Sequence, residues 1–127
     1  MESQPLLEIT VESLDTALAA ERGGADRIEL CADLLHGGLT PSVATMRKLH
    51  EEVEIPVFPI IRPRTCGFVY RESEFAAMKR DISFARDLGV DGALIFNAVP
   101  IGREGAHIVV ELPTQGAVAV PICPMYR

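Results

Sequence analysis

Apolar and polar residues alternate at the start of the chain, and the pattern then changes to helical spacing. Residues 6–11 alternate with a period of two, which predicts a first strand with one apolar face. Residues 14–22 carry apolar side chains at helical spacing directly after Ser13, a residue type that caps helices. The first elements are therefore predicted to be a strand followed by a helix.

Strand-like and helix-like segments continue to alternate along the chain. Short apolar runs predict strands at residues 27–31, 55–61 and 93–96, and apolar stripes predict helices at residues 41–53 and 72–88. Gly89-Val-Asp-Gly92 repeats Gly24-Ala-Asp-Arg27, so in both places a glycine ends a helix and an aspartate turns the chain into a strand. Such alternation builds parallel sheets, so the predicted fold class is α/β with about four parallel β/α units.

Two prolines bear on the element boundaries. Thr40 and Pro41 predict a helix start, with a hydroxyl cap and a proline in the first turn. Pro59 removes a hydrogen-bond donor from the middle of the strand predicted at residues 55–61. That run does not alternate otherwise, as is typical of a strand covered on both faces.

Residues 101–127 follow a different pattern. Glycines and prolines are scattered among apolar residues there, and no helical stripe is present. The pattern predicts at most two short strands, around residues 107–112 and 117–122. We therefore expect an irregular C-terminal tail.

Composition and charge narrow the class of protein. The 127 residues are 48% hydrophobic and 24% charged, as expected for one globular domain, and the net charge of −6 argues against nucleic acid or an anionic membrane surface as partner. No secretory signal is recognisable, and no apolar run reaches the roughly 20 residues of a membrane helix. Three widely spaced cysteines suit a reducing compartment, so we expect a cytoplasmic protein.

Four side chains of the first two predicted strands are expected to share one face. Period-two alternation places Glu8 with Thr10, and Glu29 with Cys31. If the apolar residues between them meet the helices, these four face the opposite side of the sheet. Neighbouring strands lie about 4.8 Å apart, so Thr10 and Cys31 are expected to be near neighbours.

Several ordered motifs between residue 6 and about residue 99 resemble the CutC family, whose members are described as copper homeostasis proteins with a TIM-type barrel. The motifs are AAERGGADRIELC at 19–31, GGLTPS at 37–42, IPVFPIIRPR at 55–64, FVY at 68–70 and Gly89-Val-Asp-Gly92. The resemblance implies a partial TIM-type (β/α) barrel over residues 1–100, a non-matching tail at 101–127 and a function in copper homeostasis.

The chain departs from this family in two respects. Thr10 replaces a family cysteine in the first strand, whereas Cys31 matches another. Family members also continue into four further β/α units, and no motif of these units is recognisable in this sequence. We therefore expect a truncated form, from a splice variant, a frame shift or a gene-model error. A half-barrel exposes two sheet edges, so it is expected to be marginal in stability or to self-associate.

The first functional hypothesis is copper(I) capture. Copper(I) is soft and prefers thiolates, so Cys31 is the predicted ligand and Cys66, just beyond the third strand, its alternative partner. The replacement of one family cysteine by Thr10 should weaken this binding. In the alternative interpretation, Cys31 is an ordinary buried thiol and Cys66 a loop residue.

The second hypothesis is a barrel enzyme, and whether the protein is an enzyme stays open at this stage. Glu8, Glu29 and Arg62 could hold and polarise a small polar substrate, with one glutamate as the base. The same residues could equally form a structural ion-pair network. A third interpretation is an inactive truncated product.

A small anion is the other predicted ligand. Gly38, Thr40 and Ser42 lie in the turn before a helix, whose N–H groups and hydroxyls suit an anion, and Arg64 supplies a positive charge. Such a turn is more often only a helix cap. The predicted partners are thus a copper ion or a small anionic molecule.

Overall fold

The computed structural model describes residues 5–97 and 106–111. In chain order the elements are β1 (Glu8–Val11), α1 (Leu14–Arg22), β2 (Arg27–Leu30), the short 3₁₀ helix η1 (Leu34–His36), α2 (Val43–Glu52), β3 (Val57–Ile61), α3 (Glu72–Leu88), β4 (Gly92–Asn97) and β5 (Ala106–Glu111). The predicted alternation of strands and helices is confirmed as far as β4. The strand predicted at residues 117–122 lies outside the described residues.

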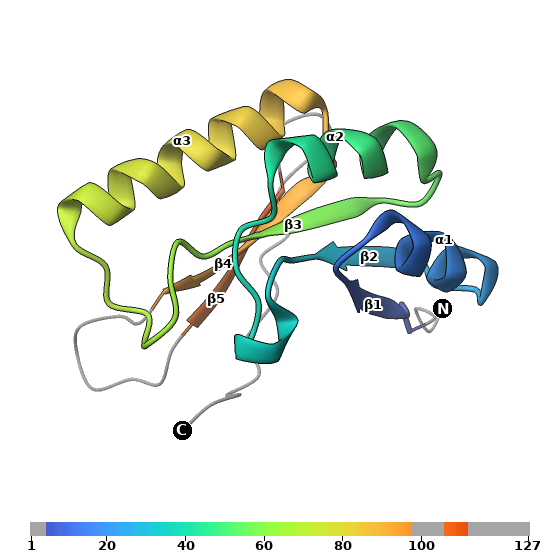
Figure 1. Ribbon diagram of the computed structural model, residues 1–127, viewed down its shortest axis with the longest axis horizontal. Coiled ribbons are helices and arrows are strands. Elements are labelled where there is room, and N and C mark those ends of the chain that lie inside the picture. Colours follow the sequence, from blue (N-terminus) through green and yellow to red (C-terminus); the bar gives the residue numbers. More distant parts are fainter. Residues whose placement is uncertain (1–4, 98–105, 112–127) are drawn as a thin grey trace.

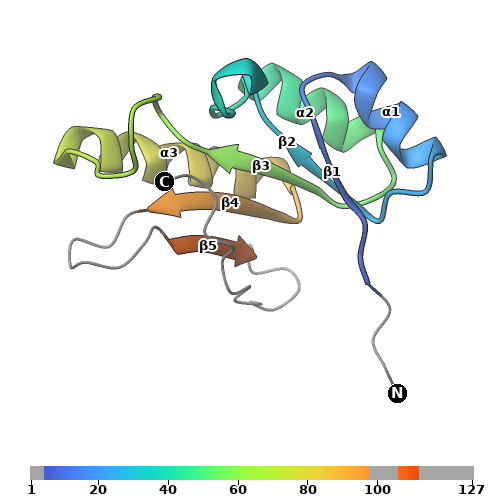
Figure 2. The ribbon, with the colours of Figure 1, turned by 90° about the horizontal axis from the view of Figure 1, so that it is seen from below.

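The five strands form one sheet in the order β1-β2-β3-β4-β5. Strands β1 to β4 pair in parallel, and β5 pairs antiparallel with β4. Helices α1, α2 and α3 lie on one side of this sheet (Figures 1 and 2), and no helix in the described ranges is long and apolar enough to cross a membrane. Four parallel strands alternating with helices confirm the predicted α/β class, in the arrangement that builds TIM-type barrels.

The main core lies between the sheet and the helices. Strand residues that point toward the helices pack against buried helix residues; they include Val11, Ile28, Leu30 and Val57 from the strands and Ala17, Met46 and Leu49 from the helices. The apolar residues of the second strand therefore meet the helices, which is the condition for its polar residues to face the other side of the sheet. Strand β3 is buried along its whole length, Pro59 included.

The repeated Gly-Val/Ala-Asp motif performs the same structural task in both copies. Asp26 precedes β2, and its Oδ2 accepts a hydrogen bond from the Leu7 N–H at 2.7 Å. Asp91 precedes β4, and its Oδ2 accepts from the Val57 N–H at 3.1 Å. Each aspartate therefore fastens the start of the neighbouring strand to its own turn, which fixes where two parallel strands begin together.

The start of α2 differs from the prediction. The helix begins at Val43, and its N-cap is Ser42, whose hydroxyl accepts from the Thr45 N–H at 3.1 Å. The expected cap, Thr40, lies ahead of the helix and is bonded to the backbone of Arg62. The segment contains two hydroxyl residues that could cap the helix. Thr40 is held by its hydrogen bonds to the backbone just after β3, so Ser42 is the cap.

Candidate functional site

The sheet face turned away from the helices, called the inner face below, carries polar side chains of β1 and β2. Thr10 pairs in register with Glu29, and the Thr10 hydroxyl donates a hydrogen bond to Glu29 Oε2 at 3.3 Å. Glu8 pairs in register with Arg27, whose Nε donates to the Glu8 carboxylate. The structure thus brings Glu8, Thr10 and Glu29 together, as the alternation predicts.

The surroundings of Glu29 change its pKa. The pKa of Glu29 is raised from 4.5 to about 7, mainly by burial and then by the hydrogen bond and negative charge of Glu8. The Thr10 hydrogen bond and the Arg27 charge oppose this rise. A carboxyl group that titrates near neutral pH can either donate or accept a proton there.

Arg27 is a member of the cluster that the sequence analysis did not select. Its guanidinium lies 4.4 Å from the ring centroid of Phe58 and forms an ion pair with Glu8. The sequence does contain the information needed to select it, because alternation with a period of two places Arg27 on the same face as Glu29. The arginine predicted for this site, Arg62, makes its contacts elsewhere, at the turn around residues 36–38.

Cys31 follows β2 directly and lies beneath the Gly38 turn. The residue is 1% exposed and packs against apolar side chains of β3 and β4. A Cβ atom at Gly38 would lie 3.5 Å from the Cys31 Sγ, so the turn approaches the thiol closely. The pKa of Cys31 is raised from 9.0 to about 11, mainly by burial and in smaller part by nearby carboxylates. The thiol is therefore protonated at neutral pH.

Cys66, the other predicted copper ligand, has different surroundings. It is exposed, has a positive φ of 64° and lies 3.7 Å from the Thr65 hydroxyl. The described residues contain no group of three or more His, Cys, Asp or Glu side chains that could hold a metal ion. One predicted ligand is thus enclosed at the inner face, and the other lies on an exposed turn.

The two hydroxyls predicted to bind an anion are engaged in backbone contacts. The Thr40 hydroxyl donates to the Arg62 carbonyl at 3.0 Å and accepts from the Arg62 N–H at 2.8 Å. The Ser42 hydroxyl caps α2. Both groups therefore connect the turn to neighbouring elements.

Arg64 points toward α3 and away from the turn at which it was expected. Its guanidinium donates to both carboxylate oxygens of Glu74 at 2.5 and 3.1 Å and to the Val69 carbonyl at 2.6 Å. The pair with Arg64 lowers the pKa of Glu74 from 4.5 to about 2. The arginine at the turn is instead Arg62, whose Nη1 donates to the Gly38 carbonyl at 3.3 Å.

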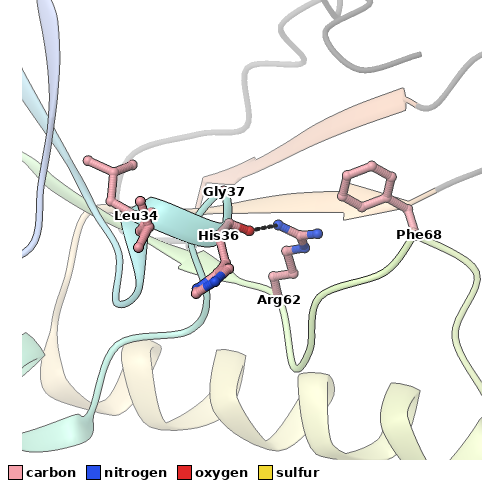
Figure 3. Close-up of a pocket in the computed structure, with 7 residues that line it drawn as sticks. Leu34, His36, Gly37, Arg62 and Phe68 are labelled. Atoms are coloured by element: carbon pink, nitrogen blue, oxygen red, sulfur yellow. Dashed lines mark hydrogen bonds between the residues drawn. The ribbon is translucent and has the colours of Figure 1, made fainter.

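A pocket of about 630 Å³ opens beside this arginine (Figure 3). We call it the Arg62 pocket, and its lining is Leu34, Leu35, His36, Gly37, Arg62, Gly67 and Phe68. It lies where η1 meets the loop after β3, beyond the carboxyl ends of the strands. Parallel β/α folds bind their ligands at this end of the sheet.

Fold and site together define a parallel β/α protein of the TIM-barrel type, with polar groups on the inner face and at the carboxyl ends of its strands. Within this class, the chain belongs to the CutC family, whose sequence model matches residues 5–111. The match includes β5, and it extends beyond residue 99, where the resemblance found from motifs ends.

The chain is similar to named relatives over part of their length. The human copper homeostasis protein cutC homolog is 48% identical over 107 residues, which are 84% of this chain and 38% of that protein. A family protein CutC of Salmonella paratyphi B is 55% identical over 87 residues, 68% of this chain and 35% of its own length. The chain therefore spans little more than a third of each of these relatives.

A solved structure supports the same fold. It is a crystal structure assigned as the copper homeostasis protein CutC of Streptococcus agalactiae, with a TM-score of 0.64 and 35% sequence identity. The similarity covers 71% of this chain and 44% of that one.

Proposed function

We propose that this chain acts in copper homeostasis by binding Cu(I) through the Cys31 thiolate. The names of its relatives support the first part of the proposal. The observation that carries the second part is the position of Cys31, directly after β2 and packed against inner-face side chains of β3 and β4. Soft Cu(I) prefers a thiolate to the carboxylate and hydroxyl oxygens of the neighbouring cluster.

Cu(I) has to displace a proton from Cys31, because burial raises the pKa of this thiol to about 11. Metal binding to a protonated ligand releases the proton, so the affinity depends on pH. With one thiolate ligand, and at pH values below the thiol pKa, the Cu(I) affinity rises about tenfold for each unit by which the pH increases. A weak site at neutral pH that strengthens in alkali is therefore expected.

The first prediction concerns competition for Cu(I) with a chromophoric chelator such as bicinchoninate, under reducing conditions and at several pH values. Cys31→Ser should lower the affinity at least about tenfold, because a hydroxyl replaces the soft ligand. Cys66→Ser is the matched control, and since Cys66 lies on an exposed turn it should change the affinity less than about threefold. Equal affinity of Cys31→Ser and the unchanged chain, or an affinity independent of pH, contradicts the proposal.

The carboxylate cluster favours a second function, acid–base chemistry on a small polar molecule at the inner face. Glu29 has a pKa of about 7, and the Thr10 hydroxyl orients its carboxyl group. Arg27 holds Glu8 beside it. In this proposal Glu29 transfers the proton, and Arg27 takes the place that Arg62 had in the sequence-based hypothesis.

The second prediction is tested by a thermal-shift screen of small polar and anionic molecules. Ligands of the cluster should raise the melting temperature of the unchanged chain and lose this effect in Glu29→Gln, which removes the titrating group but keeps its size. Glu51→Gln, on the exposed side of α2, is the control with the same change in charge. Ligands that stabilise Glu29→Gln equally, or a screen without any ligand, would remove this function.

A further inference from the structure

Arg62 is a buried charged residue, with only 8% of its surface exposed. Within the described part of the chain, none of the ion pairs includes it. Arg64, two residues further on, is paired with Glu74 in contrast. A buried charge without an opposite charge is costly, so the surroundings of Arg62 call for an explanation.

The groups around the guanidinium compensate its charge only in part. Nη1 donates to the carbonyls of Gly38 at 3.3 Å and His36 at 3.5 Å, and the Phe68 ring centroid lies 4.9 Å from Cζ. Nε is buried and has no hydrogen-bond partner among the described residues. Carbonyl dipoles and an aromatic face stabilise a cation, but neither brings a full negative charge.

The Arg62 pocket supplies the room for such a charge. Its lining contains no aspartate or glutamate. Asp33 directly precedes the lining residue Leu34, but its carboxylate is hydrogen-bonded to the His36 ring at 2.7 Å. Leu34, Leu35 and Phe68 give the pocket an apolar wall, and Leu35 is 90% exposed. In Figure 3 the Arg62 guanidinium lies between the His36 carbonyl, to which it is hydrogen-bonded, and the Phe68 ring.

We propose that the Arg62 pocket binds a small organic carboxylate. A carboxylate brings the full negative charge that the carbonyls and the Phe68 ring do not supply, and a planar guanidinium can donate two parallel hydrogen bonds to it. The apolar body of the ligand contacts Leu34 and Phe68. This site uses neither Cys31 nor Glu29, so it is independent of both functions proposed above.

The third prediction uses the Nε–Hε resonance of Arg62 in ¹⁵N NMR, assigned by its loss in Arg62→Lys. The probes are 3-methylbutanoate, the uncharged 3-methylbutanamide and inorganic phosphate. The carboxylate should shift this resonance with saturation, and the amide should bind at least about tenfold more weakly because it lacks the charge. Phosphate should bind more weakly than the carboxylate, because it makes no apolar contact. A resonance that does not move, or equal binding of the amide or of phosphate, overturns the proposal.

Variants give a second readout of the same site. Arg62→Gln should abolish carboxylate binding, and Arg62→Lys should weaken it at least about fivefold, since lysine keeps the charge but loses the planar fork. Arg47→Gln removes the same charge from an exposed residue of α2 that does not line the pocket, and it should bind as the unchanged protein does. Unchanged affinity of Arg62→Lys contradicts the site, and this variant decides the question if Arg62→Gln does not melt cooperatively.

Discussion

The protonation of two side chains decides what the inner face can do at neutral pH. Cys31 is protonated because burial raises its pKa to about 11, and Glu29 is half-titrated because its pKa lies at about 7. Both shifts have desolvation as their main cause. The same enclosure therefore makes the thiol less reactive and makes the carboxyl group a better proton carrier.

The fourth prediction follows from the different surroundings of Cys31 and Cys66. At pH 8, iodoacetamide should modify Cys66 at least about tenfold faster than Cys31, because only the thiolate reacts and Cys31 is both protonated and enclosed. Peptide mass spectrometry over time measures the two rates in the folded protein. In urea the two rates should converge. Comparable rates in the folded protein would show that Cys31 is not enclosed as described.

The direction of these side chains could be predicted from the sequence, but their pKa values could not. Alternation places Glu8, Thr10, Glu29 and Cys31 on one face, because side-chain direction in a strand follows from the pleated backbone alone. The shift at Cys31 depends mainly on its burial, and β3, β4 and the turn at Gly38 all lie close to this residue. No local pattern reports these contacts.

At the scale of elements, the predictions succeeded where the helix signals were strong. The helix predicted at residues 14–22 has these bounds in the structure, because Ser13 and Thr16 form a reciprocal cap. The helix predicted at residues 72–88 is likewise confirmed, and Gly89 with a φ of 86° ends it. Strand ends moved by one or two residues, as expected where pairing rather than local sequence sets the limit.

The assignment of the two arginines after β3 could not be made from sequence. Arg62 and Arg64 lie on either side of a proline in an extended segment, and the motif alone gives both the same chemistry. Tertiary contacts separate them. Glu74 of α3 binds Arg64, whereas the carbonyls of the turn before α2 receive Arg62. A turn that precedes β3 and the helix that follows it thus decide which arginine faces the pocket.

At the scale of the whole molecule, the fold has two unlike faces. Three helices cover one face of the parallel strands, and the inner face carries Glu8, Glu29 and the Cys31 cluster. Family membership was predicted from ordered motifs and the α/β class from the alternation of strands and helices, and both are confirmed. The division at residue 100, the cytoplasmic location and self-association stay predictions.

The central claim is that the parallel register of β1 and β2 gathers Glu8, Thr10 and Glu29 on the inner face. The consequence for stability has a definite sign. Because the folded-state pKa of Glu29 is raised from 4.5 to about 7, the stability from its protonated form is fully present below pH 4.5 and is lost as the pH rises through 7.

The measurement that tests this claim most directly is a pH titration of the glutamate side-chain carbons by ¹³C NMR, with Glu29 assigned by its loss in Glu29→Gln. The predicted midpoint for Glu29 is about 7. In Glu8→Gln it should fall part of the way toward 4.5, because the negative charge of Glu8 is gone while burial, the main cause of the shift, remains. A midpoint near 4.5 in the unchanged protein, indifferent to the change at Glu8, would contradict the arrangement of the inner face.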